Sequence, residues 1–287
     1  MRIEIRDAQG MTLVKSKLFK RYWLENSKGE VKSLRFKSTD EDKMGEFVCL
    51  RTDKYKLIYH KHKDEVIASA MLSEMLGVTS IVEKKVYAVY QGQNWDTAAY
   101  VLYDANGTRL GCQWDDVETI ENGFIPVKLG SKWGFLNEKL ELKIECRFDR
   151  VDTKFNEFGY AVITNDGKTG LVDRDGNVVM LDRIYRYVTF FTHNRIKIQT
   201  NEHNCQAGLI DETGKVLIPV WYDNLSFKSG YIISWKDERK GLYDINGNML
   251  LEPIYPEIME TLDSFVVEDI TVKVLPKKKE VAKKLNS

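Results

Sequence analysis

Four aspartates recur along the chain, each opening a four-residue stretch that ends in glycine. They are Asp104, Asp173, Asp211 and Asp244, in the stretches DANG, DRDG, DETG and DING. Repeated carboxylates could bind cations or transfer protons. The chain has no Asp-x-Asp-x-Asp run of calcium ligands, however, and Asp first with Gly last is the chemistry of a hairpin turn. We therefore expect each carboxylate to hold its own turn.

Histidine and cysteine offer little more. His60 and His62 stand two residues apart, and His203 stands two before Cys205. Either pair supplies two ligands where a zinc site needs three or four. Gly-rich phosphate loops, GxSxG and Cys/His nucleophile contexts do not occur in the sequence. We expect no enzyme activity, no metal and no cofactor.

Aromatic side chains are the remaining candidates, because aromatics that stay exposed mark partner sites. Phe190, Phe191, Trp221 and Trp235 cluster in one part of the chain, and the stretch YVTFF is apolar where a loop should be polar. These four are our predicted partner-binding residues. The alternative is that they pack in the core.

The elements that position these residues are copies of one unit. The stretch KWGFLN places Gly134 after Trp133, and a glycine recurs at Gly170, Gly208 and Gly241, at intervals of 36, 38 and 33 residues. Each glycine is followed three residues later by Asn or Asp. The spacing and the turns predict antiparallel strands in a repeated supersecondary unit.

Two further columns keep the same register. One is an aromatic that precedes a short polar-apolar element, at Trp114, Phe148, Tyr185, Tyr222 and Tyr255. The other, the third column, is a strand of small and apolar residues beginning near residues 45, 86, 123, 159, 195, 230 and 264. These seven strands predict about seven units.

The pattern resembles the WG-repeat family, whose units read approximately K-W-G-F-I-D, D-G, P-x-Y-D-x-I and G-x-A-x-V. The resemblance covers about residues 98 to 260. The Trp stands only at Trp133, since Thr169, Ala207 and Lys240 replace it, while Pro219 and Pro253 match the family proline. The resemblance implies a bacterial, cytosolic repeat protein and says little about activity.

The predicted fold is all-β and propeller-like, with about seven small antiparallel blades that each begin at the third-column strand. An open, superhelical β-solenoid is the alternative. We expect the repeat glycine to let the aromatic of the neighbouring element lie flat over the backbone, in packing between blades. Residues 64–77 carry Ile67, Ala70, Met71 and Met75 at helical spacing, so a short helix there competes with an outer strand.

Composition supports a solvated surface over a real core, with 43% hydrophobic, 30% charged and 11% aromatic residues. Lys plus Arg equals Asp plus Glu at 43 each, so no global charge draws the chain to nucleic acid or membrane. We expect degenerate repeats in residues 1–97, continuous as one domain with well-preserved repeats in 98–270, and a basic, disordered tail in 271–287. We expect a cytoplasmic location.

The leading functional hypothesis is a non-catalytic scaffold or adaptor that binds another protein. The alternative is a nucleic-acid-associated accessory protein that uses the lysines of the tail and a basic edge formed by Lys15, Lys17, Lys20 and Arg21. A net-neutral chain with one short basic run makes the first hypothesis the stronger one.

Overall fold

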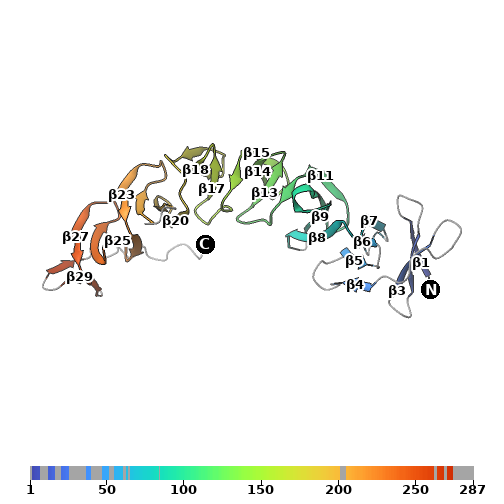
Figure 1. Cartoon of the computed structure of the whole chain (residues 1–287), viewed down its shortest axis with the longest axis horizontal. Helices are drawn as coiled ribbons and strands as arrows, with labels where there is room; N and C mark the ends of the chain where they lie inside the picture. The colour runs from blue at the N-terminus through green and yellow to red at the C-terminus, as the bar shows by residue number, and fades with distance from the viewer. Residues whose placement is uncertain are drawn as a thin grey trace, which may run out of the picture. The chain divides into compact units, whose positions relative to one another are not determined.

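The computed structural model consists of small β-sheets along the whole described chain (Figure 1). It describes residues 65–83, 85–200 and 205–261, with the separate segments 2–6, 12–16, 21–25, 37–39, 47–51, 55–60, 63, 264–267 and 270–273. Within these residues the strands form eight antiparallel meanders, numbered here sheets 1 to 8 in chain order. The one helical element described is a 3-10 turn, η1 (Trp95–Thr97).

The first three sheets cover the N-terminal part of the chain. Sheet 1 contains β1 (Arg2–Arg6), β2 (Thr12–Ser16) and β3 (Arg21–Glu25). Sheet 2 contains β4 (Lys37–Thr39), β5 (Phe47–Arg51), β6 (Tyr55–His60) and β7 (Glu65–Met71). Sheet 3 contains β8 (Met75–Val82), β9 (Val86–Gly92), β10 (Ala99–Asp104) and β11 (Arg109–Trp114).

Sheets 4 to 6 follow, each with four strands. Sheet 4 contains β12 (Asp116–Val117), β13 (Phe124–Leu129), β14 (Lys132–Asn137) and β15 (Leu142–Phe148). Sheet 5 contains β16 (Arg150–Val151), β17 (Tyr160–Asn165), β18 (Lys168–Asp173) and β19 (Val178–Met180). Sheet 6 contains β20 (Tyr187–Thr192), β21 (Arg195–Gln199), β22 (Ala207–Ile210) and β23 (Val216–Tyr222).

The last two sheets lie at the C-terminal end of the described chain. Sheet 7 contains β24 (Asn224–Lys228), β25 (Tyr231–Lys236), β26 (Arg239–Asp244) and β27 (Met249–Tyr255). Sheet 8 contains β28 (Met259–Glu260), β29 (Ser264–Val267) and β30 (Ile270–Lys273). The fold is therefore all-β and repetitive, as predicted.

Each of the seven third-column strands falls in a different sheet, and the described strands add one more sheet at residues 2–25. The expectation that a sheet begins at the third-column strand is wrong. That strand is the second of its sheet, and the first comes from the element after the aromatic. In three places a single aspartate separates one sheet from the next, at Asp115, Asp149 and Asp223.

The helix expected near residues 64–77 is also wrong, and the outer-strand alternative is confirmed. Residues 65–71 form β7, the fourth strand of sheet 2, and β8 begins at Met75. A turn joins them, in which the Glu74 amide donates to the Met71 carbonyl at 3.0 Å and the Met71 amide donates to the Glu74 carboxylate at 2.9 Å.

Contacts divide the chain into two compact units. Unit 1 is residues 1–165 with 172–177, and unit 2 is residues 166–171 with 178–287, so that residues of sheet 5 fall in both. The boundaries predicted at residues 97 and 270 stay predictions.

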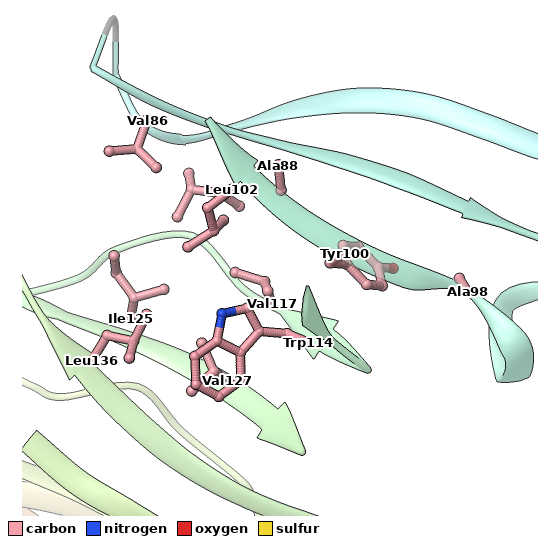
Figure 2. Close-up of a cluster of buried hydrophobic side chains, with 11 residues drawn as sticks. Val86, Ala88, Ala98, Tyr100, Leu102, Trp114, Val117, Ile125, Val127 and Leu136 are labelled. Carbon is pink, nitrogen blue, oxygen red and sulfur yellow. The ribbon is translucent and has the colours of Figure 1, made fainter. Parts of the chain in front are cut away.

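Within each unit, the repeated aromatic fills the space between successive sheets. In unit 1, Trp114 at the end of β11 is buried in one cluster with Leu102 of sheet 3 and with Val117 and Val127 of sheet 4 (Figure 2). In unit 2, Tyr222 at the end of β23 is buried with Leu225 of sheet 7. The aromatic column thus supplies the apolar packing between neighbouring sheets.

The four turn aspartates hold their own turns, as expected. Asp244 Oδ1 accepts hydrogen bonds from the amides of Asn246 and Asn248, both at 2.8 Å. The carboxylates of the other three accept the same two bonds, at distances from 2.7 to 3.0 Å; these are Asp104, Asp173 and Asp211. Asn137 does this with its amide oxygen in the turn that lacks glycine.

The glycine that ends each turn makes the contact with the preceding sheet. A Cβ on Gly247 (φ +84°) would lie 2.5 Å from the carbonyl oxygen of Leu217 in β23, and one on Gly107 would lie 2.9 Å from the ring of His60 in β6. Cations of the earlier sheet also bond these turns, since Arg147 donates to the Gly176 carbonyl and Lys63 to the Gly107 carbonyl. Packing between sheets therefore uses the turn glycine.

The glycine of the WG column has a different role from the one expected. A Cβ on Gly134 would lie 2.5 Å from the carbonyl oxygen of Ile144 in β15, the next strand of the same sheet. Gly208 and Gly241 face β23 and β27 in the same way. A Cβ on Gly208 would lie 2.9 Å from the carbonyl oxygen of Ile218, and one on Gly241 would lie 2.9 Å from that of Leu251. The expectation that an aromatic lies flat over this glycine is therefore wrong at these three positions.

The cause is a bulge in the outer strand. Trp133 pairs with Phe148, but Phe135 pairs with Ile144, so two steps along β14 match four along β15. The same shift occurs between β22 and β23 and between β26 and β27. The extra residues fold toward the third strand, and only glycine leaves room for them.

Candidate interaction surface

The residue directly before each repeated aromatic lies at the surface. This position is exposed in all five copies, at Gln113, Arg147, Ile184, Trp221 and Ile254. The fold therefore requires no apolar side chain there. We call these five residues the pre-aromatic column.

The column changes character along the chain. In unit 1 it holds a glutamine and an arginine. In unit 2 it holds apolar side chains, with Ile184 exposed by 44%, Trp221 by 49% and Ile254 by 57%. Exposed apolar surface that the fold does not require is typical of binding surfaces.

A second outward position lies at the start of the outer strand in sheets 3, 4, 6 and 7. In unit 2 it holds Val216, 54% exposed, and Met249, 52% exposed, with Leu250 beside it at 40%. Leu142 takes this position in sheet 4 of unit 1 and is 49% exposed, while sheet 3 has an exposed Arg109. We give the name outer-strand set to six of the exposed apolar residues of unit 2: Ile184, Val216, Trp221, Met249, Leu250 and Ile254.

Trp221 is the largest member of the set and is held in place by charge. The ammonium of Lys236 lies 5.1 Å from the centre of the indole ring, a cation–π contact. The Asp223 carboxylate lies 3.9 Å from the same ammonium and accepts a hydrogen bond from the Asp237 amide at 2.8 Å. One face of the ring is thus in contact with Lys236, while about half of the residue stays exposed.

The other three predicted partner-binding residues are largely covered. Phe191 stacks on Phe227 with ring centres 5.7 Å apart and packs on the core of sheets 6 and 7. Trp235 packs on the cluster between sheets 7 and 8, and Phe190 is half-buried in β20. The structure therefore brings together Trp221 and Lys236, which stands next to Trp235, rather than four exposed aromatics.

The positions equivalent to Trp133 serve local packing. Trp133 itself is half-buried, with the Lys128 ammonium 6.0 Å from its ring centre. Thr169 is buried and accepts a hydrogen bond from the Tyr185 amide at 2.9 Å, and Ala207 is fully buried. Lys240 forms an ion pair with Glu257 at 2.9 Å. The copies thus fill the same position with different side chains that make different interactions.

The carboxylates of the repeated aspartates accept hydrogen bonds from the residues of their own turns. Burial acts to raise the pKa of Asp244, but hydrogen bonds from Asn248, Asn246 and Gly247 outweigh it, and the pKa lies below the ordinary aspartate value. The same balance lowers the pKa of Asp211, where the opposing bonds come from Thr213 and Lys215. These carboxylates are acceptors for backbone amides.

The histidines and the lysine tail complete the predicted candidates. His60 is fully buried, with Nε2 3.0 Å from the Ala105 carbonyl oxygen and Nδ1 accepting the Lys63 amide at 3.3 Å. His62 and His203 lie outside the described residues, as do Lys17, Lys20 and the tail beyond Lys273. A membrane-spanning helix would need a long apolar stretch, and the described residues contain no such helix.

Comparison with known proteins finds the WG-containing repeat at residues 109–133, 133–168 and 208–233. A comparison with curated proteins finds no match. Among solved structures, Hsv2 of Kluyveromyces lactis is 11% identical at a TM-score of 0.34, covering 73% of this chain and 75% of that one.

A second similar structure is a eukaryotic initiation factor, 11% identical at a TM-score of 0.39, covering 92% of this chain and 84% of that one. Likeness at these scores carries no conclusion about what this chain binds. The matched segments span β11 to β18 and β22 to β25, where the repeat columns are clearest in the sequence. These three segments match the WG-containing repeat, so the resemblance expected from the sequence is confirmed.

Proposed function

We propose that this chain is a non-catalytic protein-interaction scaffold that binds its partner through the outer-strand set of unit 2. The observation that carries the proposal is the change in the pre-aromatic column, which is polar in Gln113 and Arg147 and apolar in Ile184, Trp221 and Ile254. The position is exposed in every copy, so the apolar side chains add nothing that the fold needs.

The partner we expect is a protein that presents apolar side chains. Exposed Trp anchors dominate the energy of many protein interfaces, and the fixed ring of Trp221 loses little side-chain entropy on binding. Val216 and Met249 extend the apolar area along the same outer strands. The proposal places the scaffold function in the described repeats and assigns none to the lysine tail.

The test compares three forms of the full chain, immobilised and exposed to lysate of the native host. They are the unchanged chain, the double variant Trp221→Gln with Ile254→Gln, and a control with Gln113→Ala in the same column of unit 1. Because Gln113, Trp221 and Ile254 are exposed, we expect each variant to melt like the unchanged chain.

We expect a protein retained by the unchanged chain and by the control to fall about tenfold or more in the unit 2 variant. Equal retention by all three forms would contradict the proposed surface. If no protein is retained above an empty matrix, the scaffold proposal itself fails.

A further inference from the structure

The connection between the second and third strands of sheet 3 is longer than the fold requires. Sheets 4, 5 and 7 make this connection with two residues each, Gly130–Ser131, Asp166–Gly167 and Asp237–Glu238. Sheet 3 uses six, residues 93–98. The extra residues are therefore available for another purpose.

The longer loop is rigidly built. Asn94 and Thr97 form a capping box around η1, in which the Asn94 side chain accepts from the Thr97 amide at 3.1 Å and Thr97 Oγ1 accepts from the amides of Gln93 and Asn94 at 3.2 Å. The loop also folds back on Gly92, where a Cβ would lie 2.6 Å from the Cα of Ala98. A side chain on this loop is thus presented in a fixed position.

The loop presents Trp95. Its side chain is 66% exposed, the highest value among the large hydrophobic side chains described. The indole ring rests on Tyr90 with ring centres 5.5 Å apart, and Tyr90 lies 5.7 Å from Tyr100, whose buried side chain appears in Figure 2. Tyr90 in turn lies over Gly77, where a Cβ would come within 2.2 Å of its hydroxyl oxygen. Three aromatic rings in tilted contact therefore connect the exposed Trp95 to the core.

The surroundings of Trp95 are polar. Gln91, Gln93, Asn94, Asp96 and Thr97 are all exposed. Asn94 and Thr97 are used in the capping box, and Gln91 donates to the Ser69 carbonyl at 3.1 Å. In the described part of the chain, the side chains of Gln93 and Asp96 make no hydrogen bond or ion pair. The loop thus carries an exposed indole together with an unused amide and an unused carboxylate.

This arrangement differs from the outer-strand set, where apolar residues occur in number. The centre of a protein interface surrounds its aromatic anchor with further apolar contacts. A sugar ring has the opposite distribution, with an apolar C–H face and hydroxyl groups around its edge. The face can stack on an indole while Gln93 and Asp96 bond the hydroxyls.

We propose that residues 93–98 form a carbohydrate-binding loop, in which Trp95 stacks on one pyranose ring of a glycan and Gln93 and Asp96 bind its hydroxyl groups. The site goes beyond the scaffold function and lies in unit 1, on different residues. With one stacking ring the affinity for a single chain end is low, with a dissociation constant of about 1 mM.

The test titrates the full chain with soluble oligosaccharides of glucose, N-acetylglucosamine, mannose and galactose, using calorimetry and tryptophan fluorescence. We expect at least one series to bind, Trp95→Ala to weaken that binding about tenfold or more, and Trp221→Ala, which removes another exposed indole, to leave it unchanged. Asp96→Asn and Gln93→Ala each weaken binding several-fold, and Asn94→Ala does so by loosening the loop.

Three results overturn the proposal. The first is that no oligosaccharide series binds at about 10 mM sugar, ten times the expected dissociation constant. The second is sugar binding that the Trp95→Ala variant retains. The third is that no sugar binds and the Trp95→Ala variant loses a protein partner. The last outcome would make Trp95 a protein anchor. Melting curves of each variant separate a lost site from an unfolded chain.

Discussion

Sheets 4 and 7 build the same four strands and the same outer bulge with different residues in their turns. Sheet 4 turns at Asn137-Glu-Lys-Leu140, and Leu140 takes a φ of +64°. Sheet 7 turns at Asp244-Ile-Asn-Gly247, with a φ of +84° at the glycine. Leu140 packs its side chain on the core between sheets 3 and 4, whereas Gly247 brings its backbone against Leu217.

The difference shows which parts of the repeat are fixed. The glycine under the bulge is the same in both sheets, because the strand above it leaves no space for a Cβ. The turn residue can vary, since a leucine contact can replace a close backbone contact at the cost of a strained φ. The two glycine columns are therefore not equivalent, and substitutions should separate them.

The largest effect should come from the glycine under the bulge. Gly134→Val in sheet 4 and Gly241→Val in sheet 7 should each lower the free energy of unfolding by about 3 to 4 kcal/mol, since the new Cβ meets backbone atoms that cannot withdraw. Urea unfolding of the full chain measures it. A loss below about 0.5 kcal/mol in either sheet would show that the bulge can move and that the two sheets differ here as well.

Exchanging the turn residues should have unequal effects. Gly247→Leu should cost about 2 to 3 kcal/mol, because it combines the positive φ with a Cβ 2.5 Å from the Leu217 carbonyl oxygen. Leu140→Gly should change stability by less than about 1 kcal/mol, since relief of the strained φ offsets the lost packing. If both substitutions lowered the free energy of unfolding equally, the proposed difference between the leucine contact and the close backbone contact would be wrong.

A smaller effect of opposite sign is expected at Ser234. Sheet 4 has Val127 at the equivalent place in the strand, while Ser234 is fully buried and its hydroxyl has no hydrogen-bond partner among the described residues. Ser234→Ala should stabilise the chain by about 1 kcal/mol, because it removes a buried unsatisfied group. The matched control is Ser264→Ala, where the hydroxyl bonds to Thr261 and its loss should destabilise. Destabilisation by both would indicate that Ser234 is satisfied.

The smallest effect should be on the loss of stability at acid pH. The pKa of Asp244 lies below its ordinary value in the folded chain, so its contribution to stability is complete above about pH 4 and is lost as the pH falls through the folded pKa. The equivalent turn residue of sheet 4 is Asn137, which does not titrate and so contributes no such dependence. Asp244→Asn should therefore reduce the loss of stability between pH 5 and about pH 2, and Asn137→Asp should increase it. Melting temperatures of the three chains measured across that pH range test the prediction, and the same pH dependence in all three would contradict it.

The sequence predicted the repeat because its columns reflect contacts that recur. The glycine makes room for the bulge, the aspartate holds the turn and the aromatic packs between sheets. Each of these roles recurs along the chain, so each residue type reappears at the same spacing. The start of sheets 4 and 5 was missed because their first strands, β12 and β16, have two residues each, too few to show alternation. The false helical stripe arose because the turn after Met71 shifts the apolar positions of β8 relative to β7.

The candidate surface was predicted in part. The exposure of Trp221 follows from its place before Tyr222, since strand alternation turns one residue outward when its neighbour is buried. Burial of Phe191 depends on Phe227 in another sheet, which a single repeat does not reveal. Trp95 belongs to a loop outside the repeat pattern, and the long connection between residues 92 and 99 was the one available signal.

The bulge has a consequence for how the molecule meets copies of itself. A chain of small sheets has many free strand edges, and free edges invite pairing with other chains. In β23 and β27 the bulge contains Pro219 and Pro253, which lack the amide hydrogen that a neighbouring strand would need. These two edges thus combine exposed apolar side chains with a backbone closed to strand addition. Their side chains are thus free to serve the proposed interaction, while the prolines oppose growth into aggregates.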